Sequence, residues 1–196
     1  MELPELRDIL GDIGGLGIAI IAIVIGLIVH WAVYRVANRI SKETTSRIDE
    51  SFLKHTRNSG RLLFVVGAIF ISTIFMNEEA RGFAREACIF FGIIGLGWFL
   101  VGLLRVGSDA VVARFPDEGP DDLEERQIRT QLEILVRFGT IIIWLVAIAI
   151  AMLTIAGVQA LAASMLAGAG VMGIVLGVAA GPLIGNLIAG IQIAFT

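Results

Sequence analysis

The most informative residue pattern lies in the last 40 positions, which hold eight glycines, nine alanines and no formal charge. Residues three or four positions apart are neighbours on a helix surface, so a helix here would present three adjacent rows. They are a glycine row (Gly170, Gly173 and Gly177), an aliphatic row (Val171, Ile174 and Val178) and a flanking row (Gly168, Met172, Val175 and Ala179). The aliphatic row lies between the other two.

This layout suits a ring of identical helices. Small residues let helix backbones approach closely in lipid, where hydrophobic collapse cannot drive association. Each glycine row would meet the flanking row of a neighbour, in a head-to-tail contact that closes by rotation. Ile174 and Val178 would then form two apolar rings around the axis, which exclude water and ions. The alternative, in which the glycines pack against other spans of the same chain, has equal weight on composition alone.

The dipeptide Gly181-Pro182 interrupts this stretch. Proline lacks a backbone N–H and disfavours helical geometry in the residue before it, so we expect a kink or break there. Pro182 can occupy the first turn of a second half-helix, which contains Asn186 and Gly190.

The sequence contains no catalytic constellation. It has no nucleophile elbow, phosphate loop or metal motif, and His30 and His55 have no partner at a useful spacing. Cys88, the single cysteine, is expected to be a small buried apolar residue. A net charge of −3 without a basic, aromatic-rich patch speaks against nucleic-acid binding. We therefore expect a protein that is not an enzyme and has no cofactor or metal.

The elements that must position the rows are membrane-spanning helices. Hydrophobic residues make up 57% of the 196 residues, above the share typical of soluble domains. Four zones lack formal charge: 13–34 (22 residues), 62–77 (16), 87–104 (18) and 138–196 (59). About 20 helical residues cross the hydrocarbon core, so the last zone holds two spans, with a turn at residues 157–159. The prediction is an all-α polytopic membrane protein of about five transmembrane helices, the last kinked and pore-lining.

Lysine and arginine counts predict the topology. The counts are one in the tail 1–12, seven in the loop 35–61, two in 77–86, five in the loop 105–137 and none in the turn 157–160. This alternation fits an outside amino terminus and a cytoplasmic carboxyl terminus. We expect an extracytoplasmic tail (1–12), outer sensor helices (13–156) and a pore-lining helix (157–196) in the inner cell membrane.

Residues 157–196 resemble the last transmembrane helix of the small-conductance mechanosensitive channel family. The similar features are the run GAGVMGIVLGVAAG, a break, and then GNLIAGIQIAF. Two weaker similarities are RQIRTQLEILVRFG (126–139) to the family's lead-in to its penultimate span, and RIDESFLKHTRNSGRLL (47–63) to the first cytoplasmic loop of members with extra helices.

The resemblance implies a homoheptamer, with membrane lipids as its other partner, that opens when membrane tension rises. It implies gate rings at Ile174 and Val178, packing through the glycine row, a kink at Gly181-Pro182, and a second half-helix near the cytoplasmic surface. The chain departs from the family in the large Met172 and Val175. The family also continues into a cytoplasmic cage, whereas the sequence given ends at Thr196.

Two other classes of protein stay open. A secondary transporter with a discontinuous helix at 181–182 would need an inverted repeat and buried polar groups. A membrane scaffold without conduction would tolerate polar residues at positions 174 and 178.

Overall fold

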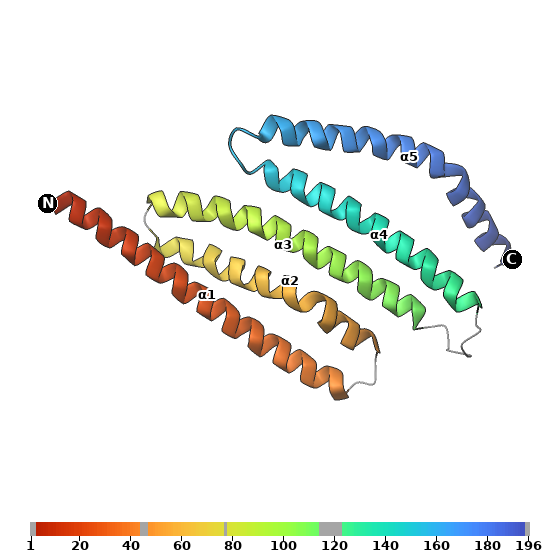
Figure 1. Cartoon of the computed structure of the whole chain (residues 1–196), viewed down its shortest axis with the longest axis horizontal. Helices are drawn as coiled ribbons and strands as arrows, with labels where there is room; N and C mark the ends of the chain where they lie inside the picture. Colours follow the sequence, from red (N-terminus) through yellow and green to blue (C-terminus); the bar gives the residue numbers. More distant parts are fainter. Residues whose placement is uncertain (1–2, 44–46, 77, 114–122, 195–196) are drawn as a thin grey trace.

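The computed structural model describes residues 3–43, 47–76, 78–113 and 123–194, and these contain no strand. Its elements are α1 (Leu3–Glu43), α2 (Arg47–Ser72), the 3₁₀ turn η1 (Thr73–Phe75), α3 (Glu78–Val112), α4 (Leu123–Met152) and α5 (Gln159–Ala194) (Figure 1). Each α-helix contains a segment long and apolar enough to cross a membrane. The prediction of an all-α chain with five such helices is confirmed.

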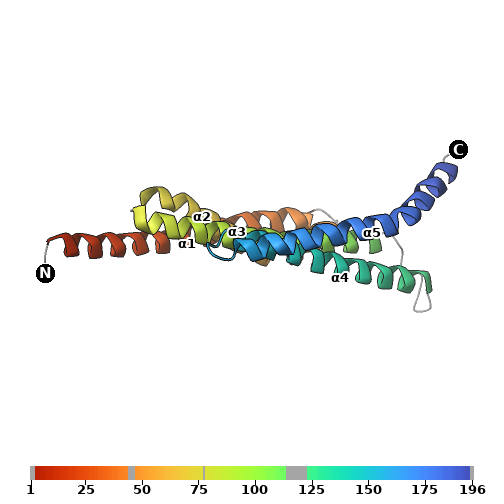
Figure 2. The same cartoon turned by 90° about the horizontal axis from the view of Figure 1, so that it is seen from above.

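The helices lie side by side in sequence order and form one antiparallel layer (Figures 1 and 2). Within the described residues, extensive contacts join α1 to α2, α2 to α3 and α3 to α4, and α4 has a much smaller contact with α5. In a single layer much of each helix faces outward, and large apolar side chains are exposed on all five helices. Water would disfavour so much apolar surface, whereas lipid accommodates it.

Glycines allow neighbouring helices within the first four to approach one another closely. A Cβ at Gly26 of α1 would lie 3.0 Å from the carbonyl oxygen of Phe64 in α2. A Cβ at Gly102 of α3 would lie 2.8 Å from the carbonyl oxygen of His55 in α2, and one at Gly97 would lie 2.7 Å from the Cβ of Ala147 in α4. Helices in lipid associate through such close contacts. The first four helices are therefore one packed unit.

The helices extend well past the charge-free zones. The expected tail 1–12 is helical from Leu3, and the expected loop 35–61 is helical at both ends, up to Glu43 and from Arg47. In the expected loop 105–137, residues 105–112 continue α3, and the stretch from Leu123, where apolar residues recur at the helical spacing of Ile128, Leu132 and Leu135, begins α4 as that spacing predicts. The loop predictions were too long because charged side chains limit what lies in hydrocarbon but do not end a helix.

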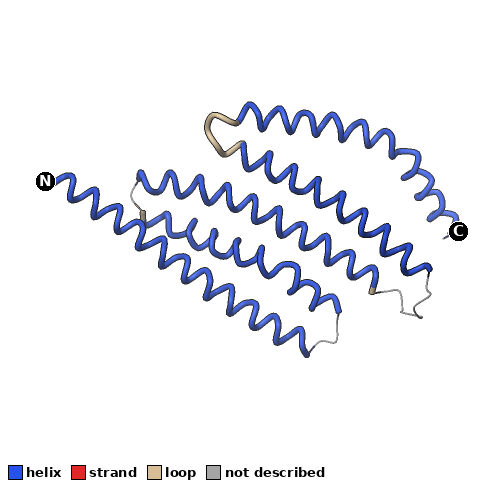
Figure 3. Tube along the Cα trace, viewed as in Figure 1, coloured by secondary structure: helices blue, strands red, loops and turns tan. Residues whose placement is uncertain are grey.

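Residues 153–158 connect α4 to α5, as the tan segment between them in Figure 3 shows. Gly157 has a φ of 92°, a backbone conformation that residues with a Cβ rarely adopt. The Gln159 side-chain amide donates to the carbonyl oxygen of Leu153 across the turn, at 3.3 Å. The turn predicted at 157–159 is present, with Gln159 as the first residue of α5.

The predicted break at Gly181-Pro182 does not divide the last helix, because α5 continues through Pro182 to Ala194. A proline removes one hydrogen bond and can be accommodated inside a membrane helix. Figure 2 shows that α5 curves in its carboxyl-terminal part.

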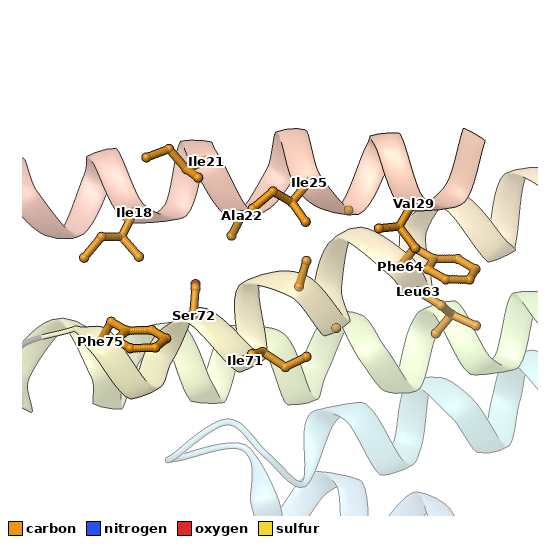
Figure 4. Close-up of a pocket in the computed structure, with 13 residues that line it drawn as sticks. Ile18, Ile21, Ala22, Ile25, Val29, Leu63, Phe64, Ile71, Ser72 and Phe75 are labelled. Carbon is orange, nitrogen blue, oxygen red and sulfur yellow. The ribbon is translucent and has the colours of Figure 1, made fainter. Parts of the chain in front are cut away.

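A crevice of about 650 Å³ lies between α1 and α2 (Figure 4). Its lining is apolar except for Ser72, whose hydroxyl donates to the carbonyl oxygen of Ile69 at 2.7 Å. The crevice therefore presents no free polar group of the described residues to a ligand.

Candidate functional site on helix α5

Helix α5 is attached to the rest of the chain near its first turns. Ala162 is fully buried there, and its backbone N–H donates to the carbonyl oxygen of Val158 at 3.0 Å. Farther along α5 the rest of the described chain no longer covers the helix, and every residue from 171 to 179 is exposed. The rows predicted from the sequence lie in this uncovered part.

The glycine row has no packing partner within the described chain. A Cβ placed at Gly170, Gly173 or Gly177 would have no atom within 4 Å, and the same holds for Gly168, Gly181 and Gly185. The glycines of α1 to α4, by contrast, lie close to a neighbouring helix at several positions. The alternative that these glycines pack against other spans of their own chain is therefore wrong for the residues described.

The aliphatic row is among the most exposed apolar surface of the molecule. Val171, Ile174 and Val178 are 63%, 70% and 75% exposed. Ile174 and Val178 are one turn apart, so their side chains lie on the same face at an axial separation of about 6 Å. No described residue of the same chain covers them.

The flanking row is also uncovered. Met172 and Val175 are exposed, as are Gly168 and Ala179. All three rows are thus exposed on the same helix, in the order around it that the sequence predicted.

The polar residues of α5 contribute little to this surface. The Ser164 hydroxyl donates to the carbonyl oxygen of Ala160, one turn back, at 2.8 Å. Asn186 is exposed. Gly190 belongs to α5, and its surroundings lie outside the described residues. The exposed face from 171 to 179 is therefore entirely apolar.

One cluster elsewhere joins residues with catalytic potential, and sequence reasoning missed it. The Ser51 hydroxyl donates to Asp109 Oδ2, and His55 Nδ1 lies 3.6 Å from the same oxygen and 3.3 Å from Ser51 Oγ. The spacing of Ser51 and His55, one helical turn, was a signal in the sequence, but Asp109 comes from α3. In a nucleophilic triad the histidine uses one ring nitrogen for serine and the other for aspartate. Here Nδ1 faces both, so the arrangement links α2 to α3 and does not activate the serine.

His30 also has a partner that the sequence did not indicate. Its Nε2 is 3.0 Å from the carbonyl oxygen of Arg57, and the Tyr34 hydroxyl is 3.0 Å from Thr56 Oγ1. Both bonds connect α1 to α2. Among the described residues, no group of three or more histidine, cysteine or carboxylate side chains could hold a metal ion.

Comparison of the chain with protein-family models, curated proteins and solved structures found no match. The described residues therefore define an all-α fold with five helices long and apolar enough to cross a membrane, and any statement of function rests on the geometry of α5.

Proposed function

We propose that the chain is a subunit of a membrane channel in which α5 lines the pore and membrane tension opens it. The observation that carries the proposal is the simultaneous exposure of the glycine row and the aliphatic row on one helix. An apolar helix that its own chain leaves bare meets either lipid or another copy of itself.

The glycine row favours another copy over lipid. Glycine contributes no side chain to lipid contact and lowers helix stability by about 1 kcal/mol relative to alanine. That cost is offset where a second backbone approaches closely. A neighbouring subunit would supply this backbone through its flanking row, and repetition of the contact closes a ring. The subunit number that the family resemblance implies is seven.

The aliphatic row would then surround the axis. Ile174 and Val178 form two successive rings, with Val171 in the next turn of the helix. An apolar constriction of this kind stops ions by excluding water, without a steric seal. We therefore assign the gate to Val171, Ile174 and Val178.

Pro182 gives the pore helix a weak point next to this gate. The N–H of residue 182 would normally bond to the carbonyl of Val178, and proline has none. We place the kink at Gly181-Pro182 on this basis, and the curvature of α5 in Figure 2 supports it. The segment beyond, with Asn186 and Gly190, would lie near the cytoplasmic membrane surface.

The packed unit of α1 to α4 would sense the bilayer. Tension favours whichever conformation has the larger in-plane area, and the population shift is set by that difference. The weak α4–α5 contact allows α5 to tilt without unpacking the other four helices.

Patch-clamp recording of Val178→Ser in giant spheroplasts tests the proposal. A polar ring should hydrate the constriction, so the channel should open at lower tension or leak. Leu176→Ser is the matched control, because Leu176 is also exposed but lies about 160° around the helix from the aliphatic row. Equal effects of the two substitutions, or no current from the parent chain at any tension, would contradict the assignment. The latter would leave the scaffold as the better description.

A further inference from the structure

A second cavity, of about 600 Å³, lies between the carboxyl-terminal part of α1 and the amino-terminal part of α2. Unlike the apolar crevice, it is lined by four cationic side chains and one carboxylate. The cations are Arg35, Lys54, Arg57 and Arg61, and the carboxylate is Glu50. This local excess of positive charge occurs in a chain whose net charge is −3.

None of the four cations of this cavity forms an ion pair within the described residues, and all four are exposed. The Arg35 guanidinium lies over the Trp31 ring, 4.7 Å from its centroid. Four cationic heads gathered in a concave site with a single carboxylate leave a net positive charge, which attracts an anion.

The base of the cavity is built from groups that satisfy one another. The buried His30 ring packs against Tyr34, with centroids 4.5 Å apart, and bonds to the Arg57 carbonyl. The Tyr34 hydroxyl has room because residue 60 is glycine, where a Cβ would lie 2.7 Å from that oxygen. These contacts fix α1 against α2 and so hold the cations in place.

The cavity lies where the charge-free zones end. Formal charge resumes at Arg35 on α1 and stops at Arg61 on α2, so the cavity is at a membrane–water interface. Trp31, which is 58% exposed beside it, is a residue type enriched at that depth. A ligand in the bilayer therefore has the most direct access to this cavity.

We propose that this cavity binds the headgroup of an anionic phospholipid. The phosphodiester would accept hydrogen bonds from the guanidinium groups of Arg35, Arg57 and Arg61, with Lys54 as a further positive charge. A zwitterionic headgroup brings its own cation into the same cluster, which is unfavourable. The proposal requires only that the chain lies in a membrane, so it stands or falls independently of conduction.

Native mass spectrometry of the full chain tests it, with phosphatidylglycerol and phosphatidylcholine of identical acyl chains. Phosphatidylglycerol should be retained preferentially, and Lys54→Gln and Arg57→Gln should each lower its retention about fivefold. Arg105→Gln, an exposed cation at the end of a charge-free zone but outside the cavity, should have no such effect. Equal retention of the two lipids, or an equal loss in Arg105→Gln, would overturn the proposal.

Two further measurements keep the test decisive if a variant does not fold. In the unchanged chain, salt raised from about 0.05 M to about 0.5 M should weaken phosphatidylglycerol retention, because a partly exposed charge cluster is screened. Soluble glycerol phosphate should not displace the lipid at comparable concentration. Displacement by it would identify a free phosphoester as the ligand and overturn the lipid assignment, as would retention that salt does not change.

Discussion

Gly97 of α3 lies against Ala147 of α4 so closely that a Cβ at position 97 would be 2.7 Å from the alanine Cβ. Gly173 of α5 has the same residue type and no described atom within 4 Å of the corresponding position. The two glycines therefore belong to two different kinds of helix surface. The first is covered by a neighbouring helix, and the second is left uncovered by the described residues.

Gly97→Ala should destabilise the packed unit of α1 to α4. The added methyl group meets Ala147 at less than contact distance, so α3 and α4 must move apart, at a cost of about 1–3 kcal/mol. Thermal unfolding in detergent, followed by circular dichroism, measures the loss. Gly107→Ala on the same helix is the control, because it has no atom within 4 Å and should not lower stability. Similar melting temperatures for both variants would show that this contact does not limit stability.

Gly173→Leu should prevent assembly of the oligomer while leaving the folding of the monomer intact. A Cβ at position 173 has no described atom within 4 Å, and the residue is exposed, so the free energy of unfolding of the monomer should change by no more than about 0.5 kcal/mol. A ring formed through the glycine row would be blocked sterically, and native mass spectrometry should detect mainly monomers. Gly107→Leu, remote from α5, should retain the oligomer. An intact ring in Gly173→Leu would exclude the glycine row from the subunit contact.

Pro182→Ala should straighten α5. Alanine restores the N–H that can bond to the Val178 carbonyl and removes the steric cause of a bend. Spin labels at exposed Ala163 and Ala189, in a Cys88→Ser background diluted with unlabelled chain, report the distance across the bend. That distance should increase, whereas Gly185→Ala, which alters no hydrogen bond, should leave it unchanged. An unchanged distance in Pro182→Ala would mean that packing, and not the proline, sets the curvature.

Ser51→Ala should loosen α2 from α3. It removes the hydrogen bond to Asp109 and leaves the 3.6 Å contact between Asp109 Oδ2 and His55 Nδ1, so the expected loss of stability is about 1 kcal/mol. Chemical unfolding in mixed micelles measures it. Ser108→Ala is the control, since the Ser108 hydroxyl forms no hydrogen bond with another described residue. If the two serine variants unfold alike, the Ser51–Asp109 bond adds nothing to stability.

Much of the fold was accessible from the sequence because lipid imposes a simple rule. A span needs about 20 apolar residues whose backbone bonds are all internal, so the charge-free zones located five helices. The rule does not locate helix ends, and the charged segments 35–43, 47–61 and 105–112 were helical, whereas the helix from Leu123 was indicated by apolar spacing and not by the absence of charge. It also gave no sign of the Asp109 partner of His55, which lies 54 positions away in the sequence.

The candidate site was partly accessible in the same way. Helical periodicity placed Gly173, Ile174 and Val175 on three adjacent faces, because residue spacing alone fixes direction around a helix. The sequence could not tell whether those faces are covered, since the glycines at positions 26, 97 and 102 look no different in composition. Only the packing of the helices shows that a neighbouring helix lies against Gly26, Gly97 and Gly102, whereas no described residue lies against Gly173.

The number of apolar spans, the order of the rows around α5 and the position of its proline can all be predicted from the sequence, because each follows from backbone geometry and local composition. Which surfaces remain uncovered, namely the exposed face of α5 and the cationic cavity between α1 and α2, is known only from the packed helices. Those surfaces depend on contacts between residues distant in sequence, and such contacts arise only when whole helices pack together.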